Sequence, residues 1–183
     1  MSDNKAEELE SGKLLVAEPF LTDPNFKRGV ILLCDHQEDG SFGFILNKPI
    51  EMNISDLISS FPDFNSEVYY GGPVQTDTIH YLHNKGSLLP NSIKVLSGVY
   101  WGGDFEQLKS FIKIQPEDIR FFVGYSGWSE GQLKAERKIL SWMLVDGHRD
   151  YIFGDSKELW KDVLEEEGGT YSVIAQIPPP ILN

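Results

Sequence analysis

The chain has 183 residues, 40% of them apolar, so it is long and apolar enough to fold as one domain around a sizeable core. Its 28 acidic and 16 basic residues give a formal net charge of −12, and the basic residues form no run. Proteins that hold nucleic acid cluster Lys and Arg against the phosphates, so this charge argues against direct binding to DNA or RNA.

The N-terminal residues are polar and acidic, and we predict a disordered acidic tail at residues 1–11 followed by one domain at 12–183. The tail lacks the apolar segment of a signal peptide, and no apolar run in the sequence is long enough to span a membrane. The one cysteine, Cys34, excludes an intrachain disulfide and suits a reducing compartment. We therefore expect a cytoplasmic protein without membrane contact.

The first half of the sequence is rich in strand patterns. An apolar run at 28–34 and a second run at 42–46 flank the turn Asp39-Gly40, which predicts a hairpin. Pro49 is expected to end the second run, and Ser55 to cap a short helix. The remaining strands predicted in this half lie at residues 13–17, 67–70, 78–82, 93–96 and 99–101.

Helices alternate with strands in the second half. The predicted helices are 104–113 with Asp104 as N-cap, one that starts at the capping box of Ser129 and Gln132 and ends near Lys138, and one that starts at Asp155 and Glu158 and ends at Gly168. The predicted strands are 119–123, 140–145 and 171–177. This order predicts an α/β (α+β-like) fold, a single domain in which helices pack on a twisted, coiled mixed β-sheet.

A glycine-rich segment, residues 124–132, lies between the predicted strand 119–123 and the helix that follows. Such strand-to-helix junctions, and turns such as Gly71-Gly72-Pro73, let backbone amides approach a ligand. The alternative is that these glycines only allow tight turns and that Trp128 belongs to the core. The candidate ligand-binding residues are Asn47, Gly71, Gly72, Pro73, Tyr125, Gly127, Trp128, Gly131 and Gln132.

Ser126 follows Gly124 and Tyr125 in a pattern that resembles the start of a hydrolase nucleophile elbow, and Asp146 and His148 follow in hydrolase order. The fifth position of that pattern requires Gly, however, and here it is Trp128. The strands that normally separate the nucleophile from its partners are also missing. We therefore expect a tight turn and assign no catalytic residue.

His80 and His83 are three residues apart, so a strand would point their rings to opposite faces and keep them from sharing a metal ion. Cys34 and His36 share a face but lack further ligands, so we predict neither a metal site nor a cofactor. Cys34 is also a redox candidate. Its reactivity requires a lowered thiol pKa, which a protonated His36 nearby would favour and Asp35 would oppose.

Six short motifs, taken in order, resemble the YqgE/AlgH family of small bacterial proteins. They are GKLLVA at 12–17, LCDH at 33–36, GFILNKP at 43–49, YGGPV at 70–74, GYSGW at 124–128 and GQL at 131–133. The resemblance covers 12–183 and implies a single-domain α/β fold with coiled mixed sheets. It also implies Ala as the usual residue at Ser126, and an uncharacterised function, with one branch labelled a transcriptional regulator of alginate production.

The resemblance favours a regulatory role through a protein partner, for which Tyr100 or Trp101 would serve as anchors if they are exposed. The alternative is a small-molecule-binding sensor, or an enzyme, with a pocket at residues 124–132. Convergence of Asn47, Gly72, Trp128 and Gln132 on one open cleft would favour the ligand hypothesis. Side chains buried apart would favour the partner hypothesis.

Overall fold

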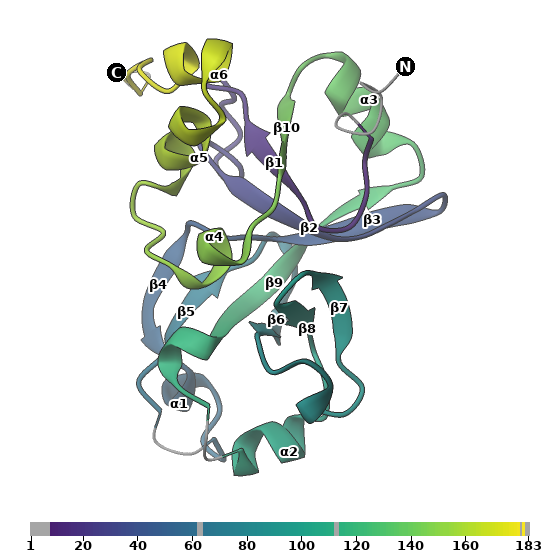
Figure 1. The fold of residues 1–183 in the computed structure, drawn as a ribbon, viewed down its shortest axis with the longest axis vertical. Coiled ribbons are helices and arrows are strands. Elements are labelled where there is room, and N and C mark those ends of the chain that lie inside the picture. Colours follow the sequence, from purple (N-terminus) through teal and green to yellow (C-terminus); the bar gives the residue numbers. More distant parts are fainter. Residues whose placement is uncertain (1–7, 62–63, 112–113, 180, 182–183) are drawn as a thin grey trace.

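One long strand, β9 (Ile119–Ser129), joins the two halves of the fold (Figure 1). The computed structural model describes residues 8–61, 64–111, 114–179 and 181. Within these ranges ten strands form one curled sheet. The later part of β9 pairs with β3 (Gly40–Ile45), and its earlier part pairs with both β5 (Glu67–Tyr70) and β6 (Val74–His83). Only the β5–β9 pairing is parallel among the described strand pairs, so the sheet is mixed.

The first half of the sheet is antiparallel and runs in the order β10 (Trp142–Asp146), β1 (Lys13–Ala17), β2 (Val30–Gln37), β3 and β9. All five residues of β1 are buried, as expected for a strand with neighbours on both edges and side chains packed on both faces. β2 and β3 form the predicted hairpin. A register shift between Leu33 and Asp35 makes Cys34 the extra residue of a bulge.

The second half of the sheet extends from the other part of β9. There β6 pairs with β8 (Val99–Trp101), and β8 pairs with the edge strand β7 (Ile93–Leu96). On the opposite side of β9, β5 pairs with β4 (Pro49–Asn53). The described part of the chain also contains two 3-10 turns, Gly86–Leu88 and Pro116–Asp118.

Helices cover both halves of the sheet and lie at its ends (Figure 1). No helix within the described ranges has the length and apolar character needed to cross a bilayer. The α-helices of the described residues are α1 (Ile54–Leu57), α2 (Phe105–Ser110), α3 (Gln132–Lys138), α4 (Arg149–Phe153), α5 (Leu159–Glu167) and α6 (Gly169–Ile174).

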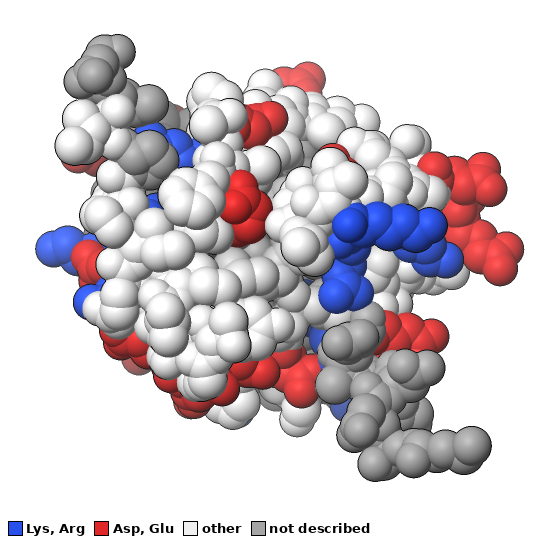
Figure 2. Space-filling view, turned by 90° about the horizontal axis from the view of Figure 1, so that it is seen from above, with Lys and Arg blue, Asp and Glu red and all other residues white. Residues whose placement is uncertain are grey.

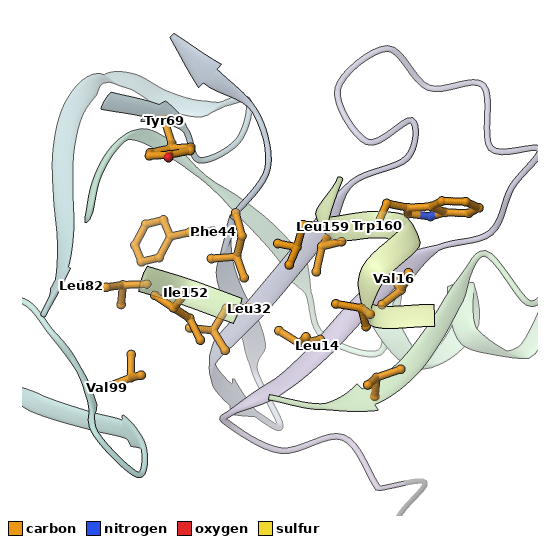
Figure 3. Packing of buried hydrophobic residues seen from close by; sticks show 14 of the residues in the cluster. Leu14, Val16, Leu32, Phe44, Tyr69, Leu82, Val99, Ile152, Leu159 and Trp160 are labelled. Atoms are coloured by element: carbon orange, nitrogen blue, oxygen red, sulfur yellow. The ribbon is translucent and has the colours of Figure 1, made fainter. Parts of the chain in front are cut away.

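Buried apolar side chains of the described residues form three clusters. The largest joins Leu14 and Leu32 of the first half-sheet to Ile152, Leu159 and Trp160 of α4 and α5 (Figure 3). The second lies on the opposite face of that half and includes the Leu133 side chain of α3. The third fills the second half around α1 and α2.

β9 contributes to all three clusters, through Phe122 in the first, Trp128 in the second and Phe121 in the third. Phe121 and Phe122 reach different clusters because successive residues of a strand face opposite sides of the sheet. Gly124, with a φ of 67° at a register shift between β6 and β9, interrupts this alternation, so Trp128 lies in a different cluster from Phe122. The strand therefore connects the hydrophobic interiors of the two halves as well as their hydrogen-bond networks.

Many predicted elements are confirmed, including the strand at residues 13–17, the hairpin and the helix that ends at Lys138. Asp104 is the N-cap of α2, and its carboxylate accepts the Gln107 amide at 3.0 Å. That helix ends at Ser110, earlier than predicted, and residues 112–113 lie outside the described residues. Residues 1–7 of the predicted tail also lie outside them, so the tail and the domain boundary stay predictions.

Some local predictions are wrong. Asn53 is the N-cap of α1, and Ser55, the predicted cap, lies inside this helix. Segment 124–129 continues β9 as a strand and is not a tight turn, because it pairs with β3. Residues 171–177 do not form a strand; helix α6 occupies Gly169–Ile174 and packs beside α5. Pro49 begins β4 instead of only ending the previous strand, at an edge position where its missing N–H costs no ladder bond.

Candidate functional site

Asn47, which follows β3, has a structural role. Its side-chain oxygen accepts the Val30 amide at 2.9 Å, and its side-chain nitrogen donates to the Arg28 carbonyl at 2.9 Å. These bonds tie the end of the β3 segment to the start of β2. Arg28 has a positive φ of 51°, so the amide of Asn47 holds a backbone turn that the chain does not adopt by default.

Gly71 and Gly72 allow two backbone segments to approach closely. A Cβ on Gly71 would lie 2.4 Å from the carbonyl oxygen of Gly124, and one on Gly72 would lie 2.3 Å from the backbone of Tyr125. Both residues are buried, whereas Pro73 is exposed. The two glycines thus serve the packing of β9 against the turn before β6, and no side chain could replace their hydrogen atoms.

Trp128 and Gln132 lie in different surroundings, the first buried and the second exposed. The Trp128 ring is 5% exposed and packs edge-on against Trp142 with ring centroids 6.2 Å apart. Gln132 is exposed, and its side-chain oxygen accepts the backbone amide of Ser129 at 3.0 Å. This is one half of the predicted capping box, but the N-cap of α3 is Gly131 and not Ser129. Asn47, Gly72, Trp128 and Gln132 therefore do not converge on one cleft.

A cleft of about 620 Å³ nevertheless opens beside β9, and Tyr125, Gly127 and Trp128 border it. The remaining walls come from strands that lie far away in the sequence. They include Phe42 of β3, His80 of β6 and Trp101 of β8. We call this space the aromatic cleft; its lining also includes Asp35, Gln37, Asp39, Gly40, Ser41 and Val74.

Most ring pairs of the aromatic cleft stand at steep angles, whereas His80 and Trp101 are inclined at 34°. Phe42 and Trp101 have ring centroids 4.8 Å apart at 60°, and Phe42 and Tyr125 are 6.1 Å apart at 79°. His80 stands at 88° to Tyr125, with centroids 5.9 Å apart. Phe42, Trp101 and Tyr125 are only partly buried at the edge of the first hydrophobic cluster, so the cleft is an outward extension of that cluster.

Gly127 keeps the floor of the aromatic cleft open. It pairs with Phe42 across the β3–β9 ladder and is exposed. A Cβ built on Gly127 would meet the Tyr125 ring at 3.3 Å and Val74 at 3.7 Å. Any side chain at this position would therefore project among the residues that wall the cleft.

The charged side chains at this cleft are acidic. Among the described residues that line it, Asp35 and Asp39 carry charge and no Lys or Arg is present. Asp35 accepts a hydrogen bond from Gln37 at 2.9 Å. Burial lowers the pKa of His80, whose ring nitrogen lies 3.1 Å from the Thr78 hydroxyl, so its imidazole is neutral near pH 7.

A second cleft, of about 990 Å³, lies on the other face of the β2–β3 hairpin and is bordered by Gly131. Its walls carry Lys134 and Lys138 of α3 together with acidic residues such as Glu38 and Glu130. Figure 2 views the molecule from above Figure 1 and shows a patch of basic side chains beside acidic ones at the right, with further basic side chains at the left. Burial and the nearby Lys134 lower the pKa of His36 on this face.

The residues considered for a serine hydrolase do not assemble. Ser126 is fully buried, and its hydroxyl donates to the Gly71 carbonyl at 3.0 Å. Asp146 forms an ion pair with Lys13. The His148 ring accepts the Asp150 amide at 3.2 Å as the N-cap of α4. Ser126 therefore lacks both the exposure and the general base that a nucleophile requires.

Cys34 is 5% exposed within the first hydrophobic cluster. Burial, with the nearby charge of Asp35, raises the pKa of its thiol. The predicted helper His36 instead bonds the Ser41 hydroxyl at 2.6 Å. A redox role would thus require the strand to open first.

The two histidines considered for a metal ion lie apart, as their spacing predicts. His80 faces the aromatic cleft. His83 is fully buried, bonds Ser92 and the Gly102 carbonyl at 2.9 Å each, and stacks on Tyr100. Among the described residues no group of three or more His, Cys, Asp or Glu side chains is placed to hold a metal ion.

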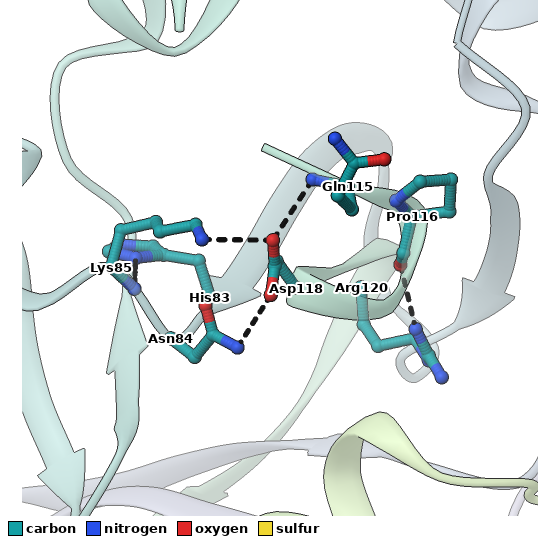
Figure 4. A network of polar contacts seen from close by, with 7 residues as sticks. All are labelled: His83, Asn84, Lys85, Gln115, Pro116, Asp118 and Arg120. Carbon is teal, nitrogen blue, oxygen red and sulfur yellow. Dashed lines mark hydrogen bonds and ion pairs between the residues drawn. The ribbon is translucent and has the colours of Figure 1, made fainter. Parts of the chain in front are cut away.

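Next to His83 a polar network ties the end of β6 to the start of β9 (Figure 4). Asp118 receives hydrogen bonds from the Lys85 ammonium at 2.9 Å, the Asn84 amide at 2.9 Å and the Gln115 backbone at 3.0 Å. Burial alone would raise the pKa of Asp118, but these bonds outweigh it and lower that pKa. The network is a structural clamp at the C-terminal end of β6.

Comparisons with known proteins agree on one family. The profile of a family described as AlgH-like matches residues 14–172. A UPF0301 protein from Chlorobaculum tepidum is 45% identical over 179 residues, covering 96% of each chain. A UPF0301 protein from Chlorobium limicola is 44% identical over 185 residues, covering 98% of this chain and 99% of the relative.

Two solved structures share the fold. The AlgH protein from Pseudomonas aeruginosa superposes with a TM-score of 0.73 at 26% identity, over 93% of this chain and 95% of that protein. A protein from Corynebacterium diphtheriae superposes with a TM-score of 0.79 at 21% identity, over 94% and 95% of the two chains, which supports the fold alone. The names of these relatives state no activity.

Proposed function

The chain belongs to the AlgH-like family, and on that premise we propose that it is a ligand-binding protein whose aromatic cleft takes a small organic molecule. The aromatic cleft itself carries this proposal. Its volume of about 620 Å³ lies within the range of about 300–1,000 Å³ that is typical of small-molecule sites. Four strands supply its rings, so a rigid sheet positions them.

Binding fits the residues better than catalysis does. The rings of Phe42, Trp101 and Tyr125 offer apolar surface, and polar groups are also part of the lining. Ser126 is buried in the sheet, and its hydroxyl donates a hydrogen bond to the Gly71 carbonyl. The cleft thus provides surface for recognition without a nucleophile beside a base.

We further propose that the protein acts as a sensor in the cytoplasm and that a protein partner recognises its ligand-bound state. The regulatory role that the family resemblance favours would then depend on whether a ligand occupies the aromatic cleft. A reducing compartment fits a chain whose one cysteine is a buried free thiol. Occupation of the cleft would bridge β3, β6, β8 and β9, which belong to different halves of the sheet.

Two measurements test the proposal. A thermal-shift screen against metabolites and nucleotides should reveal compounds that raise the midpoint of unfolding, because a ligand of the native state stabilises it. Trp101 then reports binding in the cleft by fluorescence. It is partly exposed, whereas the other three tryptophans, all within the described residues, are 5% exposed.

Gly127→Val supplies the decisive variant, because valine suits a strand and its side chain would fill the cleft floor. Ser129→Val, an exposed position on the same strand outside the lining of the aromatic cleft, is the matched control. A hit should lose at least about tenfold in affinity in Gly127→Val, equivalent to about 1.4 kcal/mol, and keep its affinity in Ser129→Val. Hits that bind both variants equally, or a broad screen with no hits, would overturn the proposal.

A further inference from the structure

We infer that the aromatic cleft selects an organic cation, a small molecule whose charged group is a substituted ammonium. This inference rests on the proposed function and names the class of ligand for the same cleft. The observation that carries it is the combination of steeply crossed aromatic rings with a rim whose formal charge is negative.

The rings of the aromatic cleft do not form one parallel stack. Phe42 stands at 60° to Trp101 and at 79° to Tyr125, and Tyr125 stands at 88° to His80. All four of these residues line the aromatic cleft, so its wall carries several aromatic rings. The face of an aromatic ring carries partial negative charge and attracts a cation, most strongly for tryptophan.

The charged side chains that line the aromatic cleft favour the same ligand. Asp35 and Asp39 line it, and the lining holds no Lys or Arg among the described residues. The basic side chains Lys134 and Lys138 border the cleft on the opposite face of the hairpin. His80 contributes a neutral ring because burial lowers its pKa. The net charge of −12 would also attract a cation from a distance.

The lining also indicates which kind of cation. A metal ion such as Mg²⁺ or Ca²⁺ prefers several oxygen ligands and keeps tightly bound water. Here the lining offers more apolar than polar surface and includes the rings of Phe42, Trp101 and Tyr125, and Gly127 leaves space beside them. A large, weakly hydrated ammonium that carries alkyl groups matches such a surface, because its charge contacts the ring faces and its carbon atoms leave water.

Calorimetric titration with choline tests the inference, with a neutral isostere as control. The control is the alcohol in which a tert-butyl group replaces the trimethylammonium group, so that shape is kept and charge is removed. Choline should bind at least about tenfold more tightly than this alcohol. Equal affinity for the two probes, or no choline binding at any accessible concentration, would overturn the cation assignment.

Variants locate the binding. Trp101→Ala should weaken choline binding by at least about tenfold, and Trp101→Phe should retain part of the affinity, because a smaller ring still offers a face. Asp39→Asn should weaken binding by about threefold at low salt and less at high salt. Circular dichroism and thermal unfolding verify that each variant is folded. Unchanged choline affinity in folded Trp101→Ala and Gly127→Val would place the binding elsewhere and overturn the inference.

A titration with a peptide distinguishes the two possible sources of the ammonium group, a free small molecule and a modified lysine side chain of a protein. A short peptide with one trimethyllysine should bind no better than choline, because the proposed ligand is a small molecule. A peptide that binds while choline does not would overturn the inference in favour of a protein ligand. Neutral hits that Gly127→Val abolishes, without choline binding, would sustain the proposed function and overturn the cation alone.

Discussion

The Oε2 atom of Glu136 lies 2.7 Å from the indole nitrogen of Trp128 and accepts its hydrogen bond. The same carboxylate oxygen accepts the indole N–H of Trp142 at 3.2 Å. Both rings are 5% exposed, so neither indole N–H can turn to water. One side chain of α3 thus pairs two buried donors of the second hydrophobic cluster, and the helix is fixed to the sheet by polar as well as apolar contacts.

Glu136→Ala should therefore lower the free energy of unfolding by about 2–6 kcal/mol, because each of two buried donors left unpaired costs about 1–3 kcal/mol. Glu136→Gln keeps an oxygen acceptor at the same place and should cost about 1 kcal/mol. Urea denaturation followed by tryptophan fluorescence measures both values. Equal losses in the two variants would show that the charge, and not the pairing of the indoles, is what stabilises the contact.

Gly124 and Gly131 form a matched pair for backbone strain, with φ values of 67° and 71°. A Cβ on Gly124 would lie 2.4 Å from the Gly72 carbonyl oxygen, whereas a Cβ on Gly131 would meet nothing within 4 Å. Gly131→Ala should cost about 1–2 kcal/mol for the left-handed conformation alone. Gly124→Ala should cost at least about 2 kcal/mol more, because the backbone must move as well. Similar midpoints of denaturation for the two variants would contradict this account.

Stability should fall as the pH drops from about 7 to 5. Burial lowers the pKa of His36, His80 and His83 in the folded protein from the ordinary value of 6.5. The unfolded chain therefore binds more protons in this range, and protons favour unfolding. The stabilisation is present above the unfolded pKa and is lost as the pH falls through the folded values. Urea midpoints measured across this range check the direction.

His83 should contribute to that slope. Its Nδ1 accepts the Lys85 amide at 3.1 Å, so a proton on this atom would break a buried bond. His83→Gln, which cannot titrate, should be less stable at pH 7 but should lose less stability on acidification. An unchanged slope in this variant would assign the acid sensitivity to the other two histidines.

The thiol of Cys34 should stay unreactive in the native protein. It is buried in the first hydrophobic cluster, and burial together with Asp35 raises its pKa, so almost no thiolate is present near pH 7. A chromogenic thiol reagent should find no reactive group in native buffer and one in denaturant, in agreement with the one cysteine of the sequence. The Cys34→Ala variant, which has no thiol, gives the background signal of the reagent. Fast labelling under native conditions would revive the redox hypothesis.

Much of the fold follows from local sequence signals. The hairpin turn at Asp39-Gly40 and the cap at Asp104 act within a few residues, and the structure contains both features. Helix α6 does not follow from such signals, because the segment YSVIAQI is rich in strand-forming residues and its helical state depends on packing beside α5. Segment 124–129 shows the opposite case, since pairing with β3 keeps a glycine-rich segment extended.

The candidate site was predictable only in part. The glycine-rich segment predicts three residues that border the aromatic cleft, namely Tyr125, Gly127 and Trp128. Phe42, His80 and Trp101 complete it, but local spacing cannot relate them. From the sequence, His80 is considered only for a metal site, which its spacing from His83 argues against, and Trp101 only as a partner anchor. Their meeting depends on the order in which β3, β9, β6 and β8 lie in the sheet, and that order comes from long-range pairing.

The position of β9 late in the chain has a consequence for synthesis on the ribosome. Every strand from β1 to β8 emerges before β9, so a nascent chain must keep the open edges of β3, β5 and β6 unpaired until residue 129 has left the exit tunnel. Exposed strand edges are templates for unwanted pairing between chains. Slow translation beyond β8, or loss of the chaperones that shield nascent chains, should therefore drive this protein into aggregates more readily than heating the finished molecule would suggest.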